Sequence, residues 1–529
     1  MTSTTSLQVA VIVDLYPPPD IHTNVQHNDQ LWATVSKLRL NDLSSYDVVR
    51  LYVLTSSPDD ANTSLEQAGV SGEDVEVKVL ATDDRIRAFY EAKQALDTEE
   101  ISDIRLVCLD LQRQFWAEVC QLLFSEVHHW TLESVNVPAL TSTGDTQDNH
   151  HAKHEPVLQS VQRFLTTLPS LLGDPEVNRS EMIPRGVFVH GYSTRRGGVT
   201  VIPTMSSMNL VYVSRKRDPR LVIDENRRRL AQVGGFDYTN FHIIRTEHGK
   251  RVWVVGEEQP VKFDGLVTNK RDVTIAAAGA DCIPLLFADP VAMVIGAAHA
   301  GWRGTVEGVA GRVVQTMTKE FGSDPKDVRV AMGPCVLPGC FGVLPDETKC
   351  FADIDPSCVV PDAIFGSHVI QDTDGSNDVN DAKDLAKSSA SGSSADCNED
   401  GDCEASTTAD SNRIVENSQK DTLIDRQHEH SPAQNTNGDG RPLASQGPAQ
   451  RTAVSPGAQG GLRKDRVAVD LTRTNRLILE REGVLPEHID TSTALCTRCN
   501  PHVYFSYERD GFPFGNQIGF ICMPSVQRE

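Results

Sequence analysis

The chain is short of several features that would place it in a familiar class of protein. No run of about 18 apolar residues occurs, because the longest apolar region, 283–300, is interrupted by Asp289, Pro290 and His299. We therefore expect no membrane span. Basic residues are outnumbered, 50 Lys and Arg against 73 Asp and Glu, which gives a formal net charge of −23. General binding to nucleic acids or to anionic lipid requires a basic face, so this balance argues against both.

The cysteines also lack a pattern. Twelve of them are scattered along the chain without the spacing of a disulfide framework. In a chain of this size that is typical of a reducing, cytoplasmic compartment, where thiols serve as core residues or metal ligands. The first apolar run, 9–13, is short and has no basic segment before it, so we expect no secretory signal peptide.

Residues 1–178 alternate between β-branched runs and segments with helical spacing of apolar residues, which predicts an α/β sheet domain. A stretch rich in proline, 14–20, follows the first strand in place of a glycine-rich phosphate loop. We therefore expect no Rossmann-type nucleotide site and favour a structural or protein-interaction domain. Strands are predicted at 7–15, 48–54, 75–80 and 104–111, and helices at 85–96, 115–124 and 154–172.

Residues 179–529 predict a second domain of mixed α/β (α+β) class. Residues 370–462 interrupt it with Asp, Ser, Asn, Gly, Ala and Gln and with few large apolar side chains. Such a segment cannot bury enough apolar surface to offset its ordering entropy, so we predict a disordered acidic insertion. Strands are predicted at 187–190, 210–213, 252–255, 273–277, 293–298, 503–506 and 518–522, and helices at 222–234, 306–321 and 472–482, with ordered sequence resuming at 466–471.

Three residues of this domain, His248, Cys282 and His299, are candidate ligands for one metal ion. Two imidazoles and one thiolate would leave a position open on a tetrahedral zinc, which distinguishes catalytic from structural sites. Each residue has an ordinary alternative as a turn residue, a core thiol or a hydrogen-bonded core histidine. Because 34 and 17 residues separate them, spacing alone leaves the shared metal open.

A CxxC pair competes with this site. Cys496 and Cys499 could form half of a structural zinc site, with Cys335 and Cys340 as the second half. The five-residue step between the latter two is a poor match to zinc-site spacing. A redox role for the CxxC pair has no thioredoxin-like context to support it.

Nine short motifs occur in order along this domain: Ser-Thr-Arg-Arg-Gly-Gly-Val at 193–199, Ser-Met-Asn-Leu at 207–210, Asn-Arg-Arg-Arg-Leu at 226–230, Thr-Glu-His-Gly at 246–249, Asp-Gly at 264–265, Ala-Asp-Cys-Ile-Pro at 280–284, His-Ala-Gly-Trp-Arg-Gly at 299–304, Gly-Pro-Cys at 333–335 and Phe-Ser-Tyr-Glu-Arg-Asp at 505–510. In these motifs and their order the chain resembles the YfiH-type laccase-domain family, also called the multicopper polyphenol oxidase family. The family has Gln-Val-His-Gly where this chain has Thr-Glu-His-Gly, and the acidic insertion has no counterpart.

The resemblance implies that His248, Cys282 and His299 bind Zn²⁺, with Cu²⁺ as the alternative. It implies a cytoplasmic purine nucleoside enzyme, with peroxisomal and nuclear locations as further implications. The implied reactions are phosphorolysis of adenosine, inosine, guanosine and S-methyl-5'-thioadenosine to the base and (methylthio)ribose 1-phosphate, with inorganic phosphate as co-substrate, and deamination of adenosine to inosine.

This chemistry suits the residues. Zinc lowers the pKa of a bound water toward about 7, and other zinc deaminases use the resulting hydroxide to attack C6 of adenine. Those enzymes need a carboxylate that transfers protons, for which Asp264, Glu247 and Asp281 are candidates; Asp264 is also a candidate substrate-binding residue. Phosphorolysis needs positive groups at the phosphate, and the candidates, each with a surface ion pair as its alternative, are Arg195, Arg303 and Arg509. Arg195 lies in a glycine-rich turn, 191–198, which is otherwise an ordinary hairpin loop.

Two other functions stay open. A copper-dependent phenol oxidase would need clustered histidines, and the 16 histidines of the chain include no His-x-His pair in the laccase-like region. A non-enzymatic adaptor would bind a protein partner through the N-terminal domain or the acidic insertion.

Overall fold

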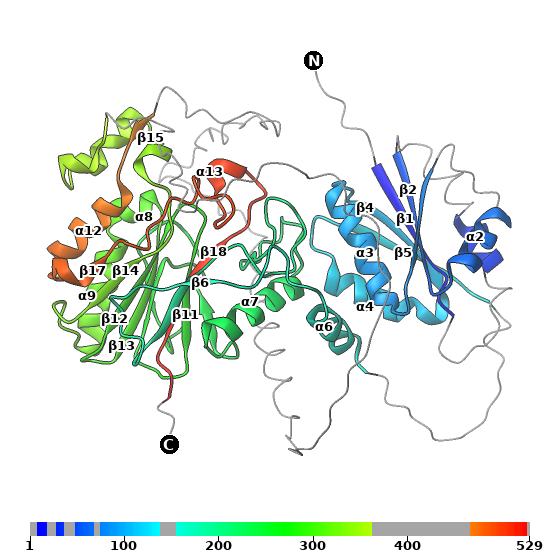
Figure 1. Ribbon diagram of the computed structural model, residues 1–529, viewed down its shortest axis with the longest axis horizontal. Helices are drawn as coiled ribbons and strands as arrows, with labels where there is room; N and C mark the ends of the chain where they lie inside the picture. The colour runs from blue at the N-terminus through cyan, green and yellow to red at the C-terminus, as the bar shows by residue number, and fades with distance from the viewer. Residues whose placement is uncertain are drawn as a thin grey trace, which may run out of the picture. The chain divides into compact units, whose positions relative to one another are not determined.

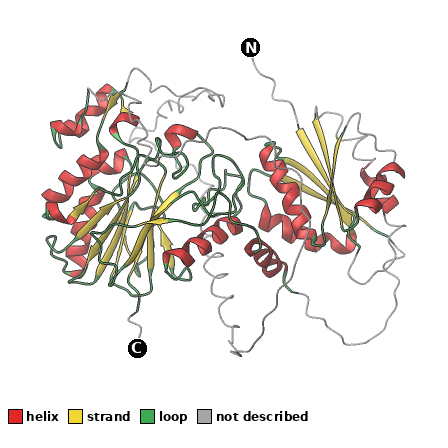
Figure 2. Cartoon of the chain, in the orientation of Figure 1, coloured by secondary structure: helices red, strands yellow, loops and turns green. Residues whose placement is uncertain are grey.

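The computed structural model describes residues 8–17, 28–35, 48–67, 75–137, 155–361 and 466–525, drawn as ribbons in Figure 1 and by secondary structure in Figure 2. Its first sheet is entirely parallel, with strand order β3-β2-β1-β4-β5. These strands are β1 (Gln8–Asp14), β2 (Val48–Thr55), β3 (Glu76–Ala81), β4 (Asp103–Leu109) and β5 (His129–Val135).

Helices cover both faces of this sheet. On one face, α3 (Arg85–Thr98), α4 (Arg113–Leu123) and α6 (Val157–Thr166) share a core with Ala10 and Ile12 of β1. On the other face, α2 (Pro58–Gln67) and a helix at 28–35 share a core with Val9, Val11 and Val13. Alternate residues of β1 therefore enter different cores, which is why residues 9–13 of this strand are all apolar. The predicted N-terminal α/β sheet is confirmed.

The other described residues build two larger sheets. The six-stranded sheet has the order β17-β14-β12-β13-β10-β9, and the five-stranded sheet has the order β6-β7-β18-β11-β8. The strands of the first are β9 (Val252–Val254), β10 (Gly265–Thr268), β12 (Ile283–Asp289), β13 (Val294–Ala300), β14 (Arg329–Met332) and β17 (Ile489–Asp490). Those of the second are β6 (Val177–Asn178), β7 (Val189–Ser193), β8 (Phe241–Ile243), β11 (Thr274–Gly279) and β18 (Gln517–Cys522).

The two sheets pack face to face. Ile275 and Ala277 of β11 lie in one core with Leu286 of β12 and Ile295 of β13. Ala276 and Ala278, which point to the opposite face of β11, pack under α7 (Arg220–Gly234). The outer face of the six-stranded sheet is covered by α8 (Trp302–Glu307), α9 (Val309–Phe321) and α12 (Leu471–Arg481). The predicted mixed α/β layered fold is confirmed, with two helical layers enclosing two sheets (Figure 1).

Short elements complete the described chain. They are β15 (Gly342–Val343), β16 (Val467–Ala468), α10 (Lys349–Ala352), α13 (Tyr507–Asp510) and the 3-10 turns η2 (Asp110–Gln112), η3 (Pro338–Cys340), η4 (Pro345–Thr348), η5 (Pro356–Cys358) and η6 (Pro486–His488).

Two predicted strands are wrong. Residues 503–506 lie outside any strand, because the side-chain amide of Gln517 accepts from the backbone N–H of Phe505 at 2.9 Å and donates to its carbonyl at 3.2 Å. Residues 210–213 are also irregular, and the side chain of Arg227 satisfies the carbonyl of Leu210 at 2.9 Å. In both segments, side chains supply hydrogen bonds to the backbone that a neighbouring strand would otherwise supply.

The helix predicted at 306–321 is in fact two helices. Gly308 separates α8 from α9 and has a φ of +85°, a left-handed conformation that ends a helix and that glycine adopts without strain. The predicted helix at 154–172 is shorter, as α6 shows.

The predicted insertion at 370–462 lies outside the described residues. On either side of it, Val360 donates its backbone N–H to the carbonyl of Ala468 at 2.9 Å, and β15 pairs with β16. Contacts join residues 1–366 and 462–529 in one compact unit, and the domain boundary after residue 178 stays a prediction. Within the described ranges, no helix combines the length and the apolar character that a membrane span requires.

Candidate metal centre

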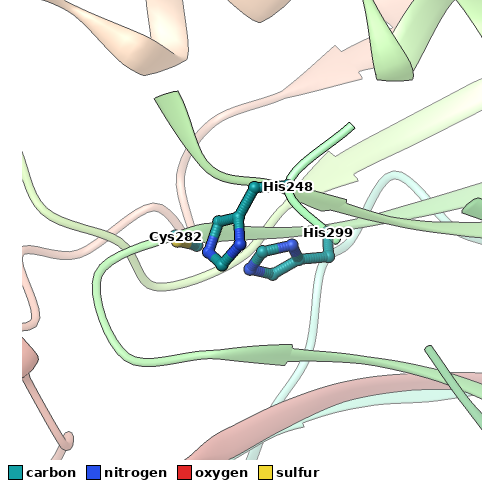
Figure 3. A group of neighbouring side chains, drawn as sticks. All are labelled: His248, Cys282 and His299. Carbon is teal, nitrogen blue, oxygen red and sulfur yellow. The ribbon is translucent and has the colours of Figure 1, made fainter. Parts of the chain in front are cut away.

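Strand pairing brings two of the three candidate ligands together. The antiparallel register of β12 and β13 places Ile283 opposite Ala300 and Pro284 opposite His299. Cys282 directly precedes β12 and therefore lies near the end of β13. His248 comes from the loop between β8 and β9, and the ligand atoms of the three residues lie within 4.8 Å of one another. Figure 3 shows these side chains converging from separate segments.

The buried carboxylate of Asp264 fixes both histidines. Its Oδ1 lies 2.9 Å from Nδ1 of His299, which leaves Nε2 of that ring for the centre. Its Oδ2 accepts the backbone N–H groups of Glu247 at 3.1 Å and Gly249 at 2.8 Å, on either side of His248. Metal-binding histidines characteristically donate their second ring N–H to a carboxylate. Asp264, a candidate substrate-binding residue in the sequence, lies behind the ligands and orients them.

Gly301 leaves the space in which the three side chains meet. A Cβ atom at this position would lie 3.1 Å from Sγ of Cys282 and 3.1 Å from Cδ2 of His248. Those distances are shorter than ordinary van der Waals contacts. Gly301 is not among the site residues predicted from the sequence. Its position directly between β13, which carries His299, and α8 is the signal that would have pointed to it.

Cys282 and His299 shift each other's pKa. Burial opposes ionisation of Cys282, but the charge of His299 and hydrogen bonds from His248 and His299 outweigh it and lower the pKa of the thiol to about 6. Burial also opposes protonation of His299, yet the charge of Cys282 and the bond to Asp264 raise its pKa to about 10. The thiolate is the form of cysteine that binds metals.

The site is open on one side. His299 is buried and Cys282 half-buried, whereas His248 is exposed. Because two imidazoles and a thiolate supply three ligands, a tetrahedral ion would keep its fourth position for a solvent molecule or substrate. The donor types, the carboxylate behind His299 and the space beside Gly301 all fit a single zinc ion.

The other two carboxylates differ in availability. Asp281 is buried and accepts from Thr497 Oγ1 at 2.6 Å and from the backbone N–H of Glu508 at 2.7 Å. Burial raises its pKa to about 7. Glu247 is exposed, and its side chain lies 3.7 Å from Arg251. Of the three candidate carboxylates, all within the described residues, Glu247 is the one that is exposed.

The three candidate arginines also differ in whether their guanidinium groups are free to bind a substrate. Arg509 forms a two-point ion pair with Asp510 and donates to three backbone carbonyls, of Thr497, Arg498 and Tyr504. Arg195 donates to three further carbonyls, of Ser206, Pro501 and Pro203. These two guanidinium groups hold loops together.

Arg303 is different. It is exposed, lies 4.4 Å from the ring centre of Trp302 and has no hydrogen bond or ion pair with any described residue. It follows Gly301 by two positions, in the first turn of α8.

Comparison with known proteins supplies further findings. The family model described as multi-copper polyphenol oxidoreductase laccase matches residues 189–377 and 442–524. A Mus musculus protein named purine nucleoside phosphorylase LACC1 is 32% identical over 448 residues, 82% of this chain and 80% of its own length. The Homo sapiens protein of the same name is 30% identical over 455 residues, 85% of this chain and 82% of its own length. A protein named adenosine deaminase RL5, from an unknown prokaryotic organism, is 33% identical over 175 residues, 31% of this chain and 65% of its own length.

Proposed function

This chain belongs to the family described as multi-copper polyphenol oxidoreductase laccase, and from that premise we propose that it is a zinc-dependent purine nucleoside enzyme. Its reactions are phosphorolysis of adenosine, inosine, guanosine and S-methyl-5'-thioadenosine, and deamination of adenosine to inosine. The observation that carries the proposal is the convergence of His248, Cys282 and His299. The names of the relatives, purine nucleoside phosphorylase and adenosine deaminase, supply the substrate class.

His248, Cys282 and His299 would hold the zinc ion. When bound, zinc supplies Lewis-acid chemistry and lowers the pKa of a coordinated water. Asp264 keeps the His299 ring in the tautomer that presents Nε2 to the centre. Glu247 is the candidate for proton transfer to the substrate, because its carboxylate is the exposed one beside a ligand.

Phosphorolysis also requires a positive group for inorganic phosphate, and Arg303 is the candidate. Its donors are not used by described residues, its guanidinium stacks on Trp302, and it follows Gly301, which adjoins the ligands, by two positions in the first turn of α8. Arg303→Ala should raise the KM for phosphate without changing adenosine deamination. Arg303→Lys, which keeps the charge, should restore part of the phosphorolysis. An unchanged KM for phosphate in Arg303→Ala would contradict this assignment.

Product analysis tests the whole proposal. Zinc-loaded protein is incubated with each of the four nucleosides, with and without phosphate, and the products are separated by HPLC. Phosphorolysis yields the base and the sugar 1-phosphate only when phosphate is present, whereas deamination yields inosine in both conditions. His299→Ala and Cys282→Ala should abolish both reactions and leave the fold intact. Absence of every product from the wild-type protein refutes the proposal.

The second candidate function is copper-dependent phenol oxidation. A His₂Cys donor set also occurs in electron-transfer copper sites, and the family description names copper oxidases. A trinuclear copper cluster would need further grouped histidines, and the second ligand cluster among the described residues consists of cysteines alone. Elemental analysis with a phenol oxidation assay separates the two functions.

A further inference from the structure

A second group of metal-binding side chains lies apart from the three ligands above. The sulfur atoms of Cys340, Cys496 and Cys499 lie within 4.8 Å of one another, and those of Cys340 and Cys499 are 3.2 Å apart. Cys340 and Cys496 are buried and Cys499 is half-buried. Cys335, the fourth cysteine that the sequence offered for such a site, is buried but does not belong to this group.

The fold holds the two segments that carry these cysteines side by side. Cys335 donates its backbone N–H to the carbonyl of Leu495 at 3.0 Å, and Thr497 donates to the carbonyl of Cys335 at 2.9 Å. Cys340 ends the η3 turn five residues later. One segment precedes the predicted insertion in the sequence and the other follows it, so nothing in local sequence requires three thiols to meet here.

Backbone N–H groups also point at one of these sulfur atoms. Those of Leu337 and Cys499 are hydrogen-bonded to the sulfur of Cys496. Backbone N–H groups directed at a cysteine sulfur stabilise the same charge that a metal-bound thiolate carries.

We propose that Cys340, Cys496 and Cys499 bind a second zinc ion, which fastens the 335–340 segment to the 496–500 segment. Zinc–sulfur bonds of about 2.3 Å in a tetrahedron place thiolates about 3.8 Å apart. Here one sulfur pair is 3.2 Å apart and all three sulfurs lie within 4.8 Å of one another, which is compatible with that value. Iron–sulfur clusters use four cysteines, and a disulfide would engage only two of the three thiols.

This ion would act as a positioning element for the first centre. Thr497, next to Cys496, donates its Oγ1 to Asp281 at 2.6 Å, and Asp281 directly precedes Cys282. Asp281 has a φ of 103°, which is costly for a residue other than glycine and must be held by its surroundings. Loss of the second ion should therefore also weaken metal binding at the first.

The test is the metal content of the full-length protein purified with zinc and reductant. We expect about two zinc ions per chain for the wild type. His299→Ala should retain about one, and Cys499→Ser should lose at least one. The matched control is Cys350→Ser, because Cys350 is exposed and belongs to neither group; it should keep both ions. If the first centre binds no metal, the wild type should hold one zinc ion, which His299→Ala keeps and Cys499→Ser loses. Failure of the proposed function can therefore be distinguished from failure of this second site.

A measurement on the wild-type protein tests the proposal even if the variants do not fold. X-ray absorption at the zinc edge should show zinc–sulfur scattering at about 2.3 Å, with an average of about two sulfurs per zinc from one Cys₃ and one His₂Cys site. One zinc per chain with a single sulfur ligand overturns the proposal. So does full metal content in Cys499→Ser, iron or copper in place of zinc, or a Cys340–Cys499 disulfide in the native protein.

Discussion

Replacing Asp264 with asparagine tests whether one carboxylate organises the candidate metal centre. Asparagine keeps the size of the side chain but has only one acceptor oxygen. Either His299 Nδ1 or the backbone N–H groups of Glu247 and Gly249 must then face an amide NH₂ group, which is also a donor. Loss of a hydrogen bond to a charged group costs about 1.5–3 kcal/mol. Since 1.4 kcal/mol is tenfold in affinity, we expect zinc affinity to fall roughly 10- to 100-fold, as for other residues that orient metal ligands.

The assay is zinc competition against a chromogenic chelator, with thermal unfolding measured in parallel. Asp289→Asn is the matched control, because Asp289 is equally buried but lies at the far end of β12, where it accepts from the backbone of Val291 and Ala292. It should leave zinc affinity unchanged. If Asp264→Asn folds and binds zinc within twofold of the wild type, the reasoning about this carboxylate is wrong.

Three further predictions follow from other parts of the structure. Gly301→Ala should weaken zinc binding with little change in melting temperature, because its Cβ would press on two ligands; Gly186→Ala, which meets nothing within 4 Å, should change neither. Burial raises the pKa of Asp218 to about 6, so the folded state binds its proton more tightly and the free energy of unfolding should fall as the pH rises from about 4 to about 6. Asp218→Asn should remove this dependence and melt at a higher temperature than the wild type at pH 8 but not at pH 4. Deletion of 375–460 should leave turnover nearly unchanged because the flanking segments are already paired; a large loss would show that the insertion contributes to the site.

The strands were the most predictable features, and the three candidate ligands predicted from the sequence do converge in the structure. Buried strands such as β1 and β18 are built around apolar runs, and hydrophobic patterning identifies these directly. Residues 503–506 are also mostly apolar, but the Gln517 side chain takes the place of a neighbouring strand. Gln517 reaches this segment only through the tertiary fold, so the local sequence pattern of residues 503–506 cannot reveal its hydrogen bonds.

The roles of polar residues were less predictable. Arg195, Arg303 and Arg509 were equivalent in the sequence as candidate phosphate ligands. In the structure they differ in how many carbonyl and carboxylate groups accept hydrogen bonds from each guanidinium. Those acceptors come from distant segments, such as Pro501 for Arg195. In the same way, the sequence offered Cys335 and Cys340 together, and only the turn at η3 decides that Cys340 alone joins the CxxC pair.

The choice between zinc and copper at the first centre is a question about the surroundings as much as about the ligands. Asp264 fixes the His299 ring and also the loop of His248, so the positions of two of the three ligands are coupled through one buried group. A centre arranged in this way holds two of its three ligands through one carboxylate and leaves the exposed His248 side open. Lewis-acid catalysis on a bound substrate needs that open side, whereas a copper site for electron transfer commonly encloses its ion with a weak axial ligand such as methionine. The open, carboxylate-braced arrangement therefore favours hydrolytic and phosphorolytic chemistry over phenol oxidation.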